Sequence, residues 1–273
     1  MDGELGQNEA PWDSAERRLV EVSVEGHVAL ISLADPERRN ILDIPLATAL
    51  REGAEQVAAI DDVRCAVLTG SGTVFAAGAD LKEIAANSAA ENLVYNRRLR
   101  AAVDAVASLP VPTIAAVNGH AIGGGLELAL ACTMRIAGVE AKLGLPEARL
   151  GIIPATGGLA RLPRLIGTSR AARLLLTGDL VSAAEAEALG LVDFTVPDGE
   201  ALTQAIEVAA RIAAAAPLST RAIVDSLRAD AALSIADANA RTEERLTKLL
   251  ESDDRHEGAR AFLERRDPEF SGS

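Results

Sequence analysis

The same order of local signals occurs twice in this chain, about 50 residues apart. Residues 63–68 form a short apolar run that ends at glycines, and a glycine-punctuated segment at 75–82 then leads toward a helix. Residues 111–117 form a second apolar run, followed by glycines at 123–125 and a helix predicted over 126–132. A short apolar run of this kind is typical of a buried strand. The pattern therefore predicts an α/β body in which one supersecondary unit is repeated.

Signals before the repeat add a hairpin and a helix to this body. Residues 19–24 and 28–33 are apolar-rich strands around a Glu-Gly turn, which predicts a β-hairpin. Asp43 is a candidate N-cap with Pro45 in the first helical turn. The apolar residues that follow recur at helical spacing, so a helix with one buried face is expected there.

Strand signals stop after residue 197, and the rest of the chain is helical by period and propensity. Helices are predicted over residues 200–216, 218–229, 235–250 and 256–265, with breaks at Pro217 and at the Asp253-Asp254 pair. We therefore expect three parts: a flexible N-terminal tail over 1–18, a core over 19–197 and a C-terminal helical region over 198–273.

Composition excludes several function classes. The 27 basic and 40 acidic residues give a net charge of −13, and aromatic residues make up 2% of the chain, so a nucleic-acid partner is not expected. Cys65 and Cys132 lie in apolar runs and are interpreted as reduced core residues. The three histidines lack zinc-site spacing, so no metal is expected. With no signal-peptide pattern and no uncharged run of 18 apolar residues, a cytoplasmic protein without membrane insertion is predicted.

The glycines before the predicted helices have two interpretations. A helix N-terminus carries unpaired backbone N–H groups and a positive partial charge, and glycine lets another group approach the backbone closely. Two such sites could together bind an oxyanion. Taken alone, a glycine cluster more often only turns the chain.

Two glutamates stand in apolar surroundings. Glu127 follows the glycines at 123–125, and Glu147 lies in a turn-rich apolar stretch. An acid in such a setting is costly to bury without a partner or a task. Simpler interpretations are a first-turn acid or a solvent-facing side chain for Glu127, and a surface charge or a partner of Arg149 for Glu147. Periodicity alone does not bring the two glutamates together.

Three segments, residues 75–83, 118–129 and 145–154, follow one another in the order and spacing of a known family. They resemble the crotonase superfamily, and specifically its enoyl-CoA hydratase branch, and the similarity extends from about residue 19 to residue 270. This resemblance implies a crotonase-like spiral of repeated ββα units. It also implies a C-terminal helical region that makes the contacts of a homotrimer or homohexamer.

The resemblance also implies an activity, the reversible addition of water across the 2,3 double bond of a 2-enoyl-CoA to give a 3-hydroxyacyl-CoA. Glu127 would orient and activate the water, Glu147 would protonate Cα, and the backbone N–H groups of Ala79 and Gly124 would bind the thioester oxygen. Coenzyme A enters as part of the substrate, and no cofactor is expected. The implied substrate contacts are Arg38, Ala77, Asp80, Leu81, Lys82 and Gly123, with the Arg265-Arg266 pair as a further phosphate contact.

Some positions depart from the hydratase pattern. Ala155 stands where glycine is common, and it would be strained if the loop required a positive φ there. Residues 41–44 differ from the frequent Ala-Leu-Asn form, and His120 is interpreted as a structural residue.

Two alternatives to the hydratase remain. One is an enoyl-CoA isomerase, or a hydratase of a branched, carnitine-type or secondary-metabolite acyl-CoA. The other is a non-catalytic CoA- or RNA-binding protein on the same scaffold.

Overall fold

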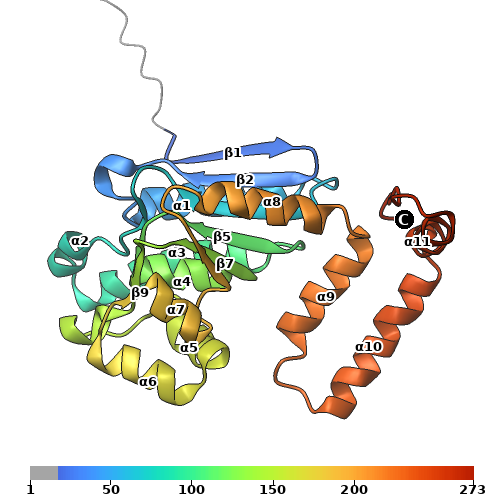
Figure 1. The fold of residues 1–273 in the computed structure, drawn as a ribbon. Helices are drawn as coiled ribbons and strands as arrows, with labels where there is room; N and C mark the ends of the chain where they lie inside the picture. The colour runs from blue at the N-terminus through green and yellow to red at the C-terminus, as the bar shows by residue number, and fades with distance from the viewer. Residues whose placement is uncertain (1–17) are drawn as a thin grey trace, which may run out of the picture.

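Two β-sheets form the centre of the molecule. The structure is a computed structural model that describes residues 18–273, so the predicted tail over residues 1–18 lies outside the described residues except for Arg18. One sheet has six strands in the order β1-β2-β3-β5-β7-β10 and the other has four in the order β4-β6-β8-β9. Figure 1 labels β1, β2, β5 and β7 of the first sheet and β9 of the second. The strands are β1 Val20–Glu25, β2 Val28–Leu33, β3 Cys65–Gly70, β4 Val74–Ala76, β5 Thr113–Val117, β6 His120–Ile122, β7 Met134–Gly138, β8 Lys142–Gly144, β9 Val181–Ser182 and β10 Phe194–Val196.

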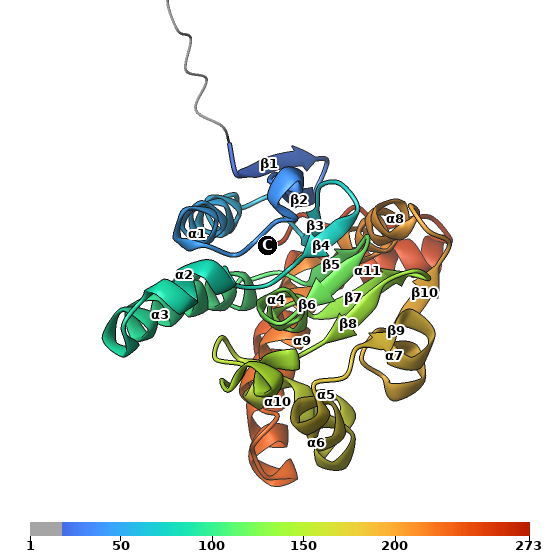
Figure 2. The same cartoon turned by 90° about the vertical axis from the view of Figure 1, so that its left-hand side faces the viewer.

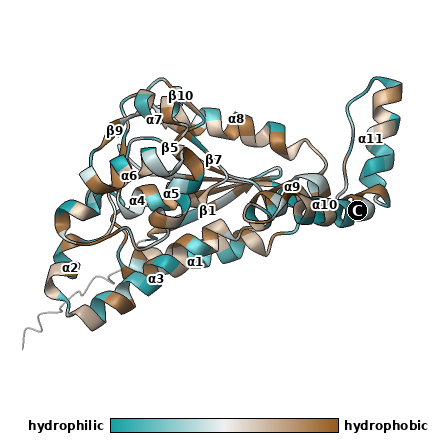
Figure 3. Ribbon diagram, turned by 90° about the horizontal axis from the view of Figure 1, so that it is seen from below, coloured by the Kyte–Doolittle hydropathy of each residue, from teal (hydrophilic) through white to brown (hydrophobic). Residues whose placement is uncertain are grey.

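Helices follow these strands and cover the sheets. They are η1 Pro36–Arg38, α1 Ile44–Ala58, α2 Leu81–Ala86, α3 Ala89–Ala107, α4 Gly124–Ala131, η2 Pro146–Leu150, α5 Gly158–Ile166, α6 Thr168–Thr177, α7 Ala183–Leu189, α8 Ala201–Ala213, α9 Pro217–Ala229, α10 Ile235–Leu250 and α11 Asp253–Glu264. Apolar and polar residues are mixed along α1 and α3, as expected of helices with one buried face (Figure 3).

The chain moves between the two sheets in a regular spiral. The pairs β3/β4, β5/β6 and β7/β8 each place their first strand in the six-stranded sheet and their second in the four-stranded sheet (Figure 2). The repeat predicted twice therefore occurs three times. The third copy escapes sequence analysis because β7 contains Arg135, whose buried guanidinium is satisfied by the carbonyls of Cys132 and Leu191.

The central strands β3 and β5 of the six-stranded sheet are buried on both faces, which explains their continuous apolar character. Cys65 and Val67 of β3 face the small apolar cluster formed with α8, whereas Ala66 and Leu68 face the main core. The predicted hairpin is confirmed as β1 and β2, which pair antiparallel. The predicted N-cap is confirmed as well, because Asp43 Oδ1 accepts a 2.9 Å hydrogen bond from the Leu46 backbone N–H.

After β10 the described chain is helical, and the predicted break between the last two helices is displaced by a few residues. It falls at residues 251–252, just before the Asp253-Asp254 pair: α11 begins at Asp253 rather than at residue 256, and Ser252 is its N-cap. Aspartates complement the positive end of a helix, so they suit its first turn better than a break. Pro217 does separate two helices, as the first residue of α9.

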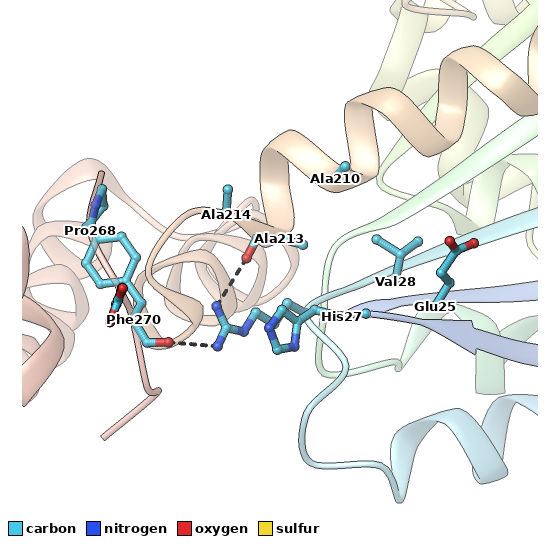
Figure 4. A pocket seen from close by; sticks show the side chains of 11 residues that line it. Glu25, His27, Val28, Ala210, Ala213, Ala214, Pro268 and Phe270 are labelled. Carbon is cyan, nitrogen blue, oxygen red and sulfur yellow. Dashed lines mark hydrogen bonds between the residues drawn. The ribbon is translucent and has the colours of Figure 1, made fainter. Parts of the chain in front are cut away.

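Helix α8 packs on the six-stranded sheet, and the later helices α9, α10 and α11 extend away from it (Figure 1). Helices α9 and α10 lie side by side on one flank of the molecule (Figure 1). Arg64, just before β3, ties this region to the body by donating hydrogen bonds to the Ala213 and Phe270 carbonyls, at 3.3 and 2.8 Å (Figure 4). None of the helices in residues 18–273 has the length and apolar character needed to cross a membrane.

A buried asparagine fixes the segment that enters the second sheet. Asn40 Nδ2 lies within 2.8–3.1 Å of the carbonyl oxygens of Ser71, Val74 and Phe75, and its Oδ1 accepts from the Asp35 backbone N–H at 3.0 Å. Its φ of 51° is one that asparagine tolerates better than most residues. Asn40 therefore holds the turn between β3 and β4 together with Asn118, whose Nδ2 donates to the Gly72 carbonyl at 2.9 Å.

We expect Asn40→Ala to lower the free energy of unfolding by about 2–4 kcal/mol, because several buried carbonyl groups lose their donor. Urea denaturation followed by circular dichroism measures this change. Asn87→Ala is the matched control, since Asn87 Nδ2 makes one 3.3 Å bond to Asn92, and it should cost less than about 1 kcal/mol. Equal losses in the two variants would contradict the role given to Asn40.

Candidate active site

The three segments singled out in the sequence meet at one edge of the four-stranded sheet. Strands β4, β6 and β8 are parallel, so the loops after their carboxyl ends lie next to one another (Figure 2). These loops and the neighbouring helices enclose a cavity of about 100 Å³. It is lined by Ala77, Gly78, Ala79, Leu81, Ile84, Asn96, Leu99, Ile122, Gly123, Gly124, Glu127, Pro146, Glu147, Leu150, Ile152, Ile153, Ala155 and Thr156.

Glycines allow the first two loops to approach each other closely. Gly78 has φ +90°, and a Cβ there would lie 2.7 Å from the Ile122 carbonyl oxygen. The Ala79 nitrogen lies 3.7 Å from the place a Cβ would take on Gly124. Among the hydrogen bonds of residues 18–273, none uses the backbone N–H of Ala79 or Gly124. Two neighbouring amides on the cavity wall are thus open to an acceptor that enters it.

Glu127 is buried and fully engaged by the chain. It is 2% exposed, on the first turns of α4. Its Oε1 accepts hydrogen bonds from the backbone N–H groups of Thr156 at 2.9 Å and Gly158 at 2.7 Å, and its Oε2 accepts from the Thr156 hydroxyl at 2.5 Å. The solvent-facing interpretation of Glu127 is therefore wrong. These donors stabilise a carboxylate whose burial would otherwise be costly.

Glu147 is buried in the same cavity with less support. It is 8% exposed, and its Oε2 has no hydrogen-bond partner in the described chain. Burial raises the pKa of Glu147 to about 7, opposed by a hydrogen bond from its own backbone N–H, while the charge of Glu127 raises it further. Arg149 is not its partner, because that guanidinium binds the Asp179 carboxylate. The surface-charge interpretation of Glu147 is wrong too.

The structure thus places two carboxyl groups of different character in one cavity. Glu127 accepts three hydrogen bonds from the chain, whereas burial raises the pKa of Glu147 to about 7. Such a pair can take a proton at one position and give one at another. Beside it are two backbone N–H groups able to stabilise an oxyanion.

A tyrosine that sequence analysis did not single out organises the first loop. The Tyr95 hydroxyl, on α3, donates to the Leu42 carbonyl at 2.7 Å and accepts from the Asp80 backbone N–H at 3.0 Å. Burial raises the pKa of Tyr95 to about 12, so it remains a neutral donor. Leu42 in turn donates its N–H to the Gly78 carbonyl at 2.8 Å. The one signal in the sequence was that Tyr95 is the single tyrosine of the chain.

The loop over residues 154–158, which follows η2, is not strained at Ala155. Gly157 adopts φ 124°, and Ala155 is not among the non-glycine residues of 18–273 with positive φ. Glycine is therefore not required at position 155. His120, on β6, is exposed, and its Nδ1 accepts a 3.2 Å hydrogen bond from the Lys142 backbone N–H. This contact agrees with its structural interpretation.

The residues predicted to contact substrate divide into two groups. Ala77, Leu81 and Gly123 line the cavity. Asp80 lies beside the cavity as the N-cap of α2. Its Oδ1 accepts hydrogen bonds from the backbone N–H groups of Lys82 at 2.9 Å and Glu83 at 3.3 Å. The Lys82 side chain is exposed just outside the cavity.

Arg38 lies among carboxylates. Its guanidinium is 2.6 Å from Asp43, 3.2 Å from Asp80 and 3.6 Å from Asp35, and the hydrogen bond to Asp43 raises its pKa, although burial opposes this. A phosphate would have to compete with these three acids, so a contact between Arg38 and CoA stays a prediction. Arg266 is likewise paired, with Glu257 and Glu264.

Comparison with known proteins is consistent with this site. A 2,3-dehydroadipyl-CoA hydratase from Escherichia coli is 38% identical over 252 residues, covering 92% of this chain and 98% of the relative. An enoyl-CoA hydratase from Mycobacterium tuberculosis is 37% identical over 252 residues, covering 91% and 95%. The crystal structure of an enoyl-CoA hydratase from Bacillus anthracis superimposes with a TM-score of 0.91 at 38% identity, covering 93% of this chain and 100% of that chain.

A family model described as enoyl-CoA hydratase/isomerase matches residues 23–273. That span includes the cavity, all the C-terminal helices and both sheets, except for the start of β1. The fold is the crotonase spiral that the sequence predicted. The chain therefore belongs to the enoyl-CoA hydratase/isomerase family of the crotonase superfamily.

Proposed function

We propose that this protein is an enoyl-CoA hydratase that adds water reversibly to a 2-enoyl-CoA. The observation that carries the proposal is the contrast between the two buried glutamates. Glu127 accepts hydrogen bonds from three donors, whereas Glu147 has its pKa raised to about 7 by burial and has one buried oxygen without a hydrogen-bond partner in the described chain. Hydration needs one base and one acid at the same time.

In the proposed reaction the thioester oxygen accepts hydrogen bonds from the Ala79 and Gly124 N–H groups. Glu127 removes a proton from a water molecule as the water oxygen bonds to Cβ, and the electrons of the double bond move toward the thioester. Negative charge collects on the oxygen, where the two amides stabilise it, each worth about 10²–10³ in rate. Glu147 then gives its proton to Cα, which completes the 3-hydroxyacyl-CoA.

The remaining assignments come from family membership and the cavity walls. The acyl end would lie against apolar side chains such as Ile84, Leu99 and Ile153. The CoA portion would leave along Ala77, Asp80, Leu81, Lys82 and Gly123, toward Arg38. The C-terminal helices would make the trimer contacts, since their exposed faces carry Ile223, Leu227 and Phe262. No metal or cofactor enters the scheme, because CoA is part of the substrate.

An isomerase differs from a hydratase in moving a proton without adding water. A single carboxyl group can take a proton from one carbon and return it to another. Two carboxyl groups on the cavity wall, one of them with an unengaged oxygen, favour the binding of a water molecule between them. This observation is why we place hydration ahead of isomerisation.

Glu127→Gln and Glu147→Gln should each lower kcat for crotonyl-CoA hydration by about 10²–10⁴-fold, since each removes a group that transfers a proton. The loss of enoyl-thioester absorbance measures the rate. Glu140→Gln is the control, because Glu140 is exposed and outside the cavity, and it should leave kcat unchanged. Full activity in both variants would overturn the assignment.

The pH dependence of kcat/KM should show a basic limb near pH 7, because the active enzyme carries the proton on Glu147. The active enzyme carries one proton on the two glutamates both for hydration and for dehydration. Both reactions should therefore lose rate over the same pH range. Initial rates from pH 5.5 to 9 measure it. A flat profile through pH 7 would contradict the role of Glu147 as the acid.

The raised pKa also predicts a stability effect. A carboxyl group with a higher pKa in the folded state than in the unfolded state makes the protein lose stability as pH rises between the two values, here from about 4.5 to about 7. Glu147→Gln removes this penalty, so at pH 8 the variant should have a higher urea midpoint, with a free energy of unfolding about 3 kcal/mol larger than that of the wild type. At pH 4 the difference should largely vanish. The same difference at both pH values would show that titration of Glu147 is not its cause.

A further inference from the structure

We infer that Thr156 is a positioning residue, whose hydroxyl holds the Glu127 carboxylate in the orientation needed to accept a proton from water. The inference rests on the hydratase function proposed above. Thr156 is 3% exposed and lines the cavity. It contacts both oxygens of Glu127, with its N–H 2.9 Å from Oε1 and its hydroxyl 2.5 Å from Oε2.

Contact from one residue to both oxygens fixes the plane of the carboxylate. The terminal torsion of a glutamate is normally broad, so a carboxylate held at one oxygen can still rotate. Here the backbone of Thr156 and Gly158 holds Oε1, and the hydroxyl of Thr156 holds Oε2. Rotation about this bond would break hydrogen bonds on both sides.

The two oxygens also differ in what they can do. Oε1 accepts from two backbone N–H groups, which can only donate, so a proton on this oxygen would face two other hydrogens. Oε2 faces a hydroxyl, which can donate in one rotamer and accept in another. Thr156 can therefore donate to the carboxylate and then rotate to accept from the carboxylic acid. This makes Oε2 the oxygen that takes the proton.

The loop that carries Thr156 is itself held in place. Arg100 of α3 donates to the Ala155 carbonyl, with Nε at 2.9 Å, and Arg161 of α5 donates to the Thr156 carbonyl at 3.1 Å. Asp104 of α3 fixes Arg161 by a 2.8 Å ion pair. The Ala155 carbonyl and the Thr156 N–H belong to one planar peptide and point in opposite directions, so the bond from Arg100 directs this N–H at Glu127.

The test compares Thr156→Val, which keeps the shape and removes the hydroxyl, with Thr156→Ser, which keeps the hydroxyl. Valine should lower kcat for crotonyl-CoA hydration about tenfold or more and change KM less than twofold, because Glu127 acts on water rather than on the thioester. Serine should recover kcat to within about threefold of the wild type. Thr48→Val is the control, since Thr48 bonds only within its own helix, and it should leave kcat unchanged. Full activity in the valine variant, or equal losses in valine and serine, would overturn the inference.

A second measurement does not depend on activity. Thr156→Val should lower the urea midpoint in the wild-type background and have little effect beside Glu127→Leu, which removes both acceptors. Additive shifts in this double-mutant cycle would overturn the contact between Thr156 and Glu127. A wild type that hydrates no 2-enoyl-CoA, with non-additive shifts, would refute the hydratase proposal while leaving the positioning of Glu127 by Thr156 supported.

Discussion

Two carboxyl groups are buried in one apolar cavity, and burial of a charged carboxyl group is unfavourable. The site depends on the hydrogen bonds by which the chain offsets this free-energy cost. Burial disfavours the charged form of a carboxyl group unless hydrogen bonds replace water. Three donors from the loop at 156–158 do so for Glu127. Nothing comparable is supplied to Oε2 of Glu147, so this group retains its proton until about pH 7. In the mechanism that we propose, this difference in hydrogen bonding divides the roles of base and acid between two chemically identical side chains.

The fold makes this arrangement possible because it moves each loop to the same place. Parallel pairing of β4, β6 and β8 aligns their carboxyl ends, and the segments that follow carry the Ala79 and Gly124 amides, Glu127 and Glu147. Side chains from outside the sheet then fix the loops. Asn40 holds the turn before β4, and Tyr95 joins the loop after it to Leu42. The geometry of the cavity therefore depends on several buried hydrogen bonds. Each has a modest energy, and together they restrict the conformation of the loops.

Sequence analysis predicted the spiral fold, the hairpin, the N-cap at Asp43 and the two glutamates as a pair of interest. It could not show that Glu127 and Glu147 share a cavity, because their approach depends on strand pairing rather than on local spacing. The third repeat was missed because the burial of Arg135 depends in part on the Leu191 carbonyl, 56 positions away in sequence. For the same reason sequence analysis noted that Ala155 departs from the hydratase pattern but did not identify the neighbouring Thr156 as a contact of Glu127. Its bond to Glu127 spans 29 positions.

The most direct test of this account is the protonation state of Glu147 in the folded protein. Infrared spectroscopy in D₂O follows the carbonyl stretch of a protonated carboxyl group across pH 5 to 9. We expect one such band to titrate near pH 7, to be absent in Glu147→Gln and to persist in Glu127→Gln. Absence of any carboxyl band above pH 6, or loss of the band in Glu127→Gln alone, would contradict the division between base and acid.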